Sequence, residues 1–175
     1  MLPCIFPGYI KFTGYREQGV ANHRAVGLST SFLLFLPQHF AVPVIKTWLN
    51  GWTTSRRMHE LTRHPCLFGC EADDDLTHYA ACPSLWEPID QAIPPLSERA
   101  VADRLAFSDA ANVFDMIRLS LAFWGYHAIK LSGDLDLCLN QSSDHSIGIL
   151  SAHVAAFCRH FDVGNLVDKL LRSDG

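Results

Sequence analysis

Four metal-ligating side chains are concentrated in one short stretch of this 175-residue chain. Cys66 and Cys70 are separated by three residues, seven more precede His78, and a further three precede Cys82. A tetrahedral zinc site needs four such ligands within about 2.0–2.3 Å of one point. Since His78 and Cys82 are four residues apart, one helical turn would place both on the same face. The spacing therefore predicts a small structural zinc knuckle, with Zn²⁺ as its cofactor.

This prediction depends on the thiols being reduced. The amino terminus lacks the basic region and continuous apolar core of a signal peptide. The longest apolar run, residues 32–36, ends at Pro37 and is far shorter than the ~20 residues that a bilayer requires. We therefore expect a nuclear or cytoplasmic protein with free thiols and no membrane contact. Two alternatives remain: the cysteines are ordinary core residues, or His64 replaces one of the ligands.

Charge is divided unevenly along the chain. Residues 1–65 contain seven Lys or Arg and two Asp or Glu, which gives +5. Residues 66–175 contain seven and sixteen, which gives −9 and a total of −4. The total argues against nucleic-acid binding over the whole surface, but it permits a local contact where the basic half meets the knuckle. The acidic carboxy-terminal half would instead suit a basic protein partner.

Prolines and glycines divide the chain into three predicted segments. Residues 1–43 are punctuated every few positions and are expected to be irregular, with loops, short strands or a short apolar helix near residues 29–36. Residues 44–88 are expected to form a helix followed by the knuckle. Residues 97–175 are expected to form a bundle of three or four helices. The predicted fold class is mainly α.

Apolar residues at helical spacing place the individual helices. One runs from Val44 to Trp52, and Thr53 or Thr54 caps another that continues through Leu61. A proline-rich linker starts at Pro83. Further helices are expected near residues 98–107, 110–131, 147–161 and 166–171. In the longest of these, Gly125 costs about 1 kcal/mol relative to alanine. The predicted core comprises Ile117, Leu121, Trp124, Leu150, Val154, Phe157 and Leu170.

The sequence predicts no catalytic site. His59 and His64 flank a glutamate, but they lie five residues apart rather than the four that the metalloprotease helix HExxH requires. Asp73–Asp75 is interpreted as a solvated acidic turn. Ser143–His145 contains residue types of a catalytic triad, but no nucleophile elbow surrounds them. We therefore expect a non-catalytic protein.

The stretch from Val44 to Trp86 resembles a region found in a known class of proteins. The resemblance is carried by WLNGWTTSRR at Trp48–Arg57, by the Cys-Cys-His-Cys ligand order, and by LTHYAACP at Leu76–Pro83. These features are similar to the zinc-binding region that follows the reverse transcriptase domain in non-LTR (LINE-type) retrotransposon proteins. The resemblance implies a fragment without the polymerase, and a role in binding RNA or DNA.

Basic and aromatic residues beside the knuckle are candidates for that contact. Arginine and lysine neutralise phosphates, and exposed aromatic rings stack on unpaired bases. The candidate contacts are Lys46, Trp52, Arg56, Arg57 and Arg63. The first hypothesis is a zinc-stabilised nucleic-acid-binding module. The alternative, in which Trp52 is a core residue and the arginines are simply solvated, is a zinc-stapled helical protein-interaction domain. A translated pseudogene with no selected function is a third possibility.

Overall fold

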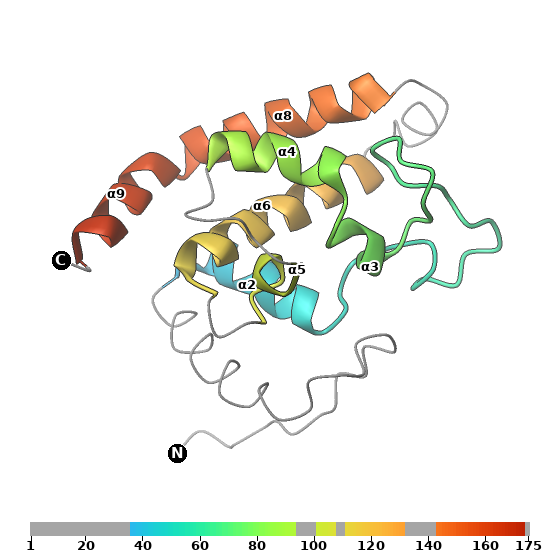
Figure 1. Ribbon diagram of the computed structural model, residues 1–175, viewed down its shortest axis with the longest axis horizontal. Helices are drawn as coiled ribbons and strands as arrows, with labels where there is room; N and C mark the ends of the chain where they lie inside the picture. Colours follow the sequence, from blue (N-terminus) through green and yellow to red (C-terminus); the bar gives the residue numbers. More distant parts are fainter. Residues whose placement is uncertain (1–35, 94–100, 108–110, 132–142, 174–175) are drawn as a thin grey trace, which may run out of the picture.

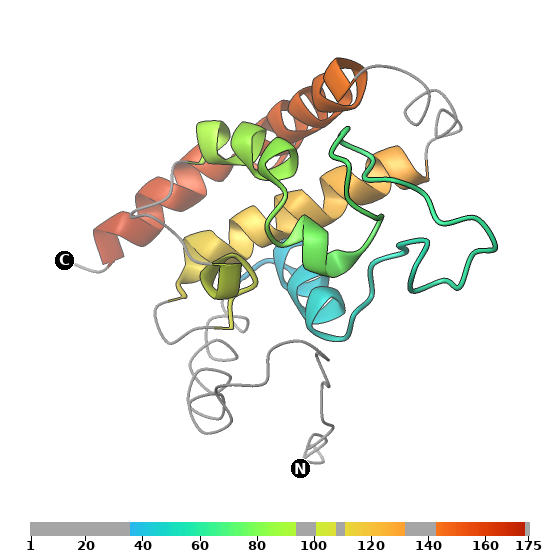
Figure 2. The ribbon, with the colours of Figure 1, turned by 45° about the vertical axis from the view of Figure 1, so that its right-hand side comes forward.

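The described part of the chain is organised around one long helix. The computed structural model describes residues 36–93, 101–107, 111–131 and 143–173. Helix α6 (Val113–Lys130) lies at the centre, with α2 (Gln38–Trp48) packed on one side (Figure 1). On the other side lie α4 (Pro83–Ala92) and α8 (Ser143–His160), which also contact each other. The second view, Figure 2, shows the same order of layers.

Three further helices complete the described part of the fold. They are α3 (Leu76–Tyr79), α5 (Val101–Arg104) and α9 (Val163–Ser173), which follows α8 closely. The described ranges hold no β-strand beyond a single bridge between Pro65 and Asp73, so the prediction of a mainly α-helical protein is confirmed for them. None of the described helices is long and apolar enough to cross a membrane.

Helix α6 is defined by its first turn and by its burial. The side chain of Asn112 accepts hydrogen bonds from the amides of Phe114 (2.9 Å) and Asp115 (3.2 Å), while the Asp115 carboxylate accepts one from the Asn112 amide. This capping box satisfies amides that a helix start leaves free. Apolar residues occur all round the helix, which is typical of a buried central helix.

Helix α2 begins earlier than expected. It starts at Gln38 and contains Pro43, whereas the sequence predicted an irregular chain to residue 43. A proline inside a helix removes the hydrogen bond to the carbonyl four residues before it. Here that carbonyl, of His39, accepts a hydrogen bond from the indole Nε1 of Trp124 (3.0 Å). Tertiary contact with α6 therefore offsets the break. The rest of the predicted irregular segment, residues 1–35, lies outside the described residues.

Helix α4 occupies the place of the predicted proline-rich linker. Pro83 is its first residue, a position where the missing amide costs nothing. Pro88 lies inside the helix, but Leu85, Trp86 and Ile89 are buried on its inner face. Burial of this face outweighs the local cost of the proline, so the linker prediction is wrong for residues 83–92.

The predicted helix through Leu61 is also wrong. Residues 55–59 form a turn, and His59 has a φ of 53°, a conformation that ends helical geometry. Thr54 does act as a cap, since its Oγ1 accepts a hydrogen bond from the Arg57 amide (3.3 Å). In Figures 1 and 2 this segment projects from the body of the protein, beyond α3.

One hydrophobic core includes residues from both predicted segments, 44–88 and 97–175. The helices of the second segment therefore do not form a separate bundle, because α6 packs on α2 and α8 packs on α4. Of the predicted core, Ile117, Leu121, Leu150 and Val154 are buried. Trp124 and Phe157 are half-buried against it, and the side chain of Leu170 lies outside the described residues.

Candidate metal centre

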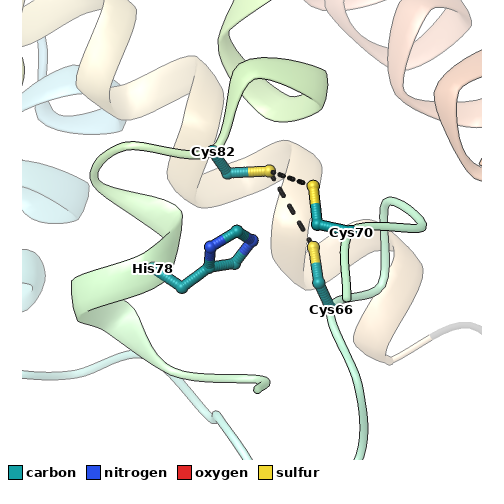
Figure 3. A group of neighbouring side chains, drawn as sticks. All are labelled: Cys66, Cys70, His78 and Cys82. Carbon is teal, nitrogen blue, oxygen red and sulfur yellow. Dashed lines mark hydrogen bonds between the residues drawn. The ribbon is translucent and has the colours of Figure 1, made fainter. Parts of the chain in front are cut away.

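The four predicted ligands meet at one point. Their ligand atoms all lie within 4.8 Å of one another. Figure 3 shows Cys66 and Cys70 on one loop, His78 on α3 and Cys82 at the start of α4, all directed toward a common centre. The sequence therefore placed the cluster correctly, at all four positions.

Local backbone geometry brings these side chains together. The loop turns at Gly69, whose φ of 80° favours glycine, and its amide donates to the carbonyl of Cys66 (3.2 Å). Helix α3 starts because the carboxylate of Asp75 caps the amide of Thr77 (3.0 Å). Cys82 is the cap residue that precedes Pro83, so the start of α4 fixes the position of its sulfur.

The distances suit a tetrahedral thiolate site. The Sγ of Cys82 lies 3.8 Å from that of Cys66 and 3.6 Å from that of Cys70. Zinc–sulfur bonds of about 2.3 Å at tetrahedral angles place two sulfurs about 3.8 Å apart. In addition, the Nε2 atom of His78 is buried without a hydrogen-bond partner. A bound metal ion would satisfy this nitrogen, so the side chains present fit a metal ion.

Electrostatics around the sulfurs favour a thiolate. The amide of Phe68 donates to the Sγ of Cys66 (3.4 Å). The Cys82 thiol, together with the amides of Phe68 and Cys70, lowers the pKa of Cys66 to about 5 despite its burial. The Cys82 thiol keeps its proton, because its hydrogen bond to Cys66 and its burial raise the pKa of Cys82. A metal ion would displace that proton, because zinc binds thiolates rather than thiols.

His64 does not complete the group. Its Nε2 atom lies 3.1 Å from the carboxylate of Glu60, and it is not one of the four side chains whose ligand atoms converge. The same glutamate also lies 3.4 Å from the ammonium of Lys130 on α6. The geometry therefore favours His78 over His64 as the histidine ligand.

Sequence reasoning missed Asp74. The sequence predicts a solvated acidic turn at Asp73–Asp75, but the side chain of Asp74 is completely buried. Its Oδ1 accepts hydrogen bonds from the hydroxyls of Tyr79 (2.9 Å) and Tyr126 (3.0 Å). Burial, followed by the charge of Asp74, raises the pKa of both tyrosines, which therefore remain donors. No local pattern distinguishes Asp74 from Asp73 and Asp75, because its partners are supplied by the fold.

The candidate nucleic-acid contacts do not form a common surface with an aromatic ring. Trp52 is only 1% exposed, packed against Tyr79 and Tyr126, with its Nε1 donating to Thr47 (2.9 Å). It cannot stack on a base, so its prediction as a contact is corrected to a core residue. The basic residues Lys46, Arg56, Arg57 and Arg63 are all exposed.

The arginines have neighbours that matter for binding. Arg56 pairs with Asp75 (2.5 Å), and Arg63 lies 4.0 Å from Asp73. Arg57 contacts the sulfur of Met58 (3.4 Å). On α2, the ammonium of Lys46 lies 5.8 Å from the ring centre of Phe123. The acidic turn between the ligand pairs therefore partly neutralises the basic residues that precede them.

Comparisons with known proteins identify no relative. No family model, curated protein or solved structure matches this chain. The resemblance to the retrotransposon region therefore rests on the motif residues alone, and the geometry of the site carries the functional argument.

Proposed function

We propose that this chain is a non-catalytic helical interaction domain stapled by one structural Zn²⁺ ion. The observation that carries the proposal is the convergence of the ligand atoms of Cys66, Cys70, His78 and Cys82 within 4.8 Å. Three thiolates and an imidazole are typical zinc ligands. Since the protein supplies four ligands, no coordination position remains for a substrate, as in structural rather than catalytic zinc sites.

The staple would join two parts of the chain that both contribute to the core. Leu67 and Phe68, between the first two ligands, are buried, and Cys82 leads directly into α4. A metal ion bound to both ligand pairs would hold this loop against α3 and α4. Structural zinc contributes about 10–16 kcal/mol in isolated finger peptides, so its removal would loosen the loop first.

A protein partner is favoured by the exposed apolar side chains. Among the described residues, the large hydrophobic side chains that remain exposed are Ile45, Leu49, Met58, Leu61 and Leu131. Most belong to the end of α2 and to the projecting segment after it. Grouped exposed apolar residues are characteristic of protein-binding surfaces.

Binding of RNA or DNA is the second candidate function. The side chains of Arg56 and Arg63 are 59% and 66% exposed, so phosphates could reach them. However, a phosphate would compete with the carboxylates of Asp75 and Asp73 for these guanidinium groups. Such binding would weaken as the salt concentration rises, because the protein must displace counterions from the phosphates in order to bind. The motif resemblance to retrotransposon proteins supports this candidate, and a basic protein partner for the acidic half remains a further prediction.

Photocrosslinking distinguishes the two candidates. A benzoylphenylalanine in place of Leu61, which is fully exposed, would report what contacts the projecting segment in cells. The matched control carries it in place of Ser151, an exposed residue of α8. A protein adduct at position 61 and none at 151 supports the interaction domain. A nuclease-sensitive adduct at position 61 supports the second candidate, and the absence of any adduct there contradicts both.

A further inference from the structure

The buried carboxylate of Asp74 links the candidate metal centre to the central helix. Asp74 lies in the loop between the two ligand pairs and is 0% exposed. Its Oδ1 accepts from the hydroxyls of Tyr79 and Tyr126. Its Oδ2 accepts from the amide of Ser55 (2.6 Å) and from the ammonium of Lys130 (3.1 Å). Four donors thus compensate the cost of burying this charge.

These donors come from three separate parts of the fold. Ser55 belongs to the turn that follows α2, Tyr79 belongs to α3, and Tyr126 and Lys130 are one helical turn apart on α6. Tyr126 and Lys130 are therefore the hydrogen-bond donors through which Asp74 attaches the loop to α6. The loss of Asp74 would remove all of these attachments together.

The same cluster reaches both ligand pairs. The hydroxyl of Tyr79 accepts a hydrogen bond from the amide of Leu67 (3.2 Å), the residue that follows Cys66. Tyr79 itself follows His78 directly on α3. Nearby, the Asp74 amide donates to the carbonyl of His64 (2.9 Å). Asp74 is therefore tied, through Tyr79, to the backbone beside one ligand from each pair.

The arrangement argues against a catalytic role for Asp74. Each of its oxygens already accepts two hydrogen bonds, and it is not among the side chains that converge on the metal centre. A carboxylate with all its acceptor positions occupied and no exposed surface can neither take a proton from a substrate nor ligate an ion without rearrangement. Its remaining role is to hold other groups in place.

We propose that Asp74 is a positioning residue that couples metal binding to the packing of α6. This inference rests on the proposed zinc site. With Asp74 in place, the loop is held so that both ligand pairs face one point before the metal arrives. Without it, the metal must also order the loop, so affinity falls. Groups that orient metal ligands typically change metal affinity about 10–100-fold when they are removed.

The test measures zinc affinity and amide exchange in the full chain. Affinity is measured by competition with a chromogenic zinc chelator, for the wild type and for Asp74→Asn. The matched control is Asp73→Asn, because Asp73 carries the same charge one residue away but is 60% exposed. Tyr126→Phe is the second variant, since it removes one hydrogen bond from α6 and leaves the ligand loop unchanged. Hydrogen exchange of residues 124–130 is followed with zinc bound and with zinc removed.

We expect Asp74→Asn to bind zinc at least about tenfold more weakly, Tyr126→Phe to bind it more weakly by a smaller factor, and Asp73→Asn to bind it as the wild type does. Zinc removal should accelerate exchange at residues 124–130 in the wild type, and less so in Tyr126→Phe. A residue that only stabilises the fold would lower the unfolding free energy without changing zinc affinity or this response.

Each outcome separates the two proposals. If the wild type binds no zinc, the proposed function fails and the coupling fails with it. If the wild type binds zinc while Asp74→Asn and Tyr126→Phe bind it equally tightly, only the coupling is overturned. Should Asp74→Asn not fold, Tyr126→Phe decides: wild-type zinc affinity and an unchanged exchange response overturn the coupling.

Discussion

Replacing Gly125 with alanine tests the packing of the central helix. Helix propensity alone predicts that the change stabilises the protein by about 1 kcal/mol. In the structure, however, a Cβ atom at this position would lie 2.4 Å from Cδ1 of Leu150 on α8. Leu150 is completely buried and has little room to move. Overpacking of this kind costs about 1–3 kcal/mol, so the net effect should be a destabilisation of about 0–2 kcal/mol.

Urea unfolding of the zinc-loaded protein measures this effect. Gly148→Ala is the matched control, because Gly148 is an exposed helical glycine of α8 with no atom within 4 Å of an added Cβ. It should stabilise by about 1 kcal/mol. Leu150→Ala alone should cost about 2–5 kcal/mol, and less in the Gly125→Ala background, where the added methyl group fills part of the space. Equal stabilisation by Gly125→Ala and Gly148→Ala, with no coupling to Leu150, would refute the α6–α8 packing.

Three further changes have defined outcomes. Gly69→Ala should destabilise the zinc-loaded protein by about 1–2 kcal/mol, because the φ of 80° at this position strains any side chain. Urea unfolding measures the effect, and a variant as stable as the wild type would contradict it. Asn112→Ala should lower the unfolding free energy by about 1 kcal/mol, because it removes the side chain that caps α6. Thermal melting tests this, and an unchanged melting temperature would argue against the cap. Burial lowers the pKa of His127 below 6.5, so the folded state binds its proton less readily than the unfolded chain does. The contribution of His127 to stability should therefore be fully present above pH 6.5 and should be lost as the pH falls below that value. His127→Leu should reduce this dependence of the unfolding free energy on pH.

The positions of the candidate metal ligands were predictable because their signal is local. Spacing alone singles out Cys66, Cys70, His78 and Cys82, because only short stretches of sequence separate these four residues. Helix α6 was predictable for a similar reason. Its apolar residues and capping residues lie within its own sequence, so tertiary structure changes only its first and last few positions.

The errors arose where distant contacts override local preference. Pro43 would normally end a helix, but the carbonyl that it leaves free is bonded by Trp124, which is far away in the sequence. Pro88 is tolerated because α4 buries its inner face. Likewise, nothing near Asp74 in the sequence indicates that Tyr126 and Lys130 would enclose it. Such partners become visible only when the helices are packed together.

Trp52 illustrates a different kind of difficulty. A tryptophan beside arginines suits either a core or a stacking surface, and its immediate neighbours in the sequence do not distinguish the two. The structure encloses its ring among Tyr79, Phe123 and Tyr126. Basic residues near a buried tryptophan can still bind phosphates, but they lose the aromatic platform that would recognise unpaired bases.

The most direct test of the zinc staple is the zinc content of the purified 175-residue chain. Elemental mass spectrometry should find about one zinc ion per chain, since four ligands complete one tetrahedral site. Cys70→Ser should lose most of this zinc. Cys158→Ser should keep it, because Cys158 lies on α8, outside the converging group. A chain that purifies without zinc, fails to take it up under reducing conditions, and melts at the same temperature as Cys70→Ser would contradict the zinc staple.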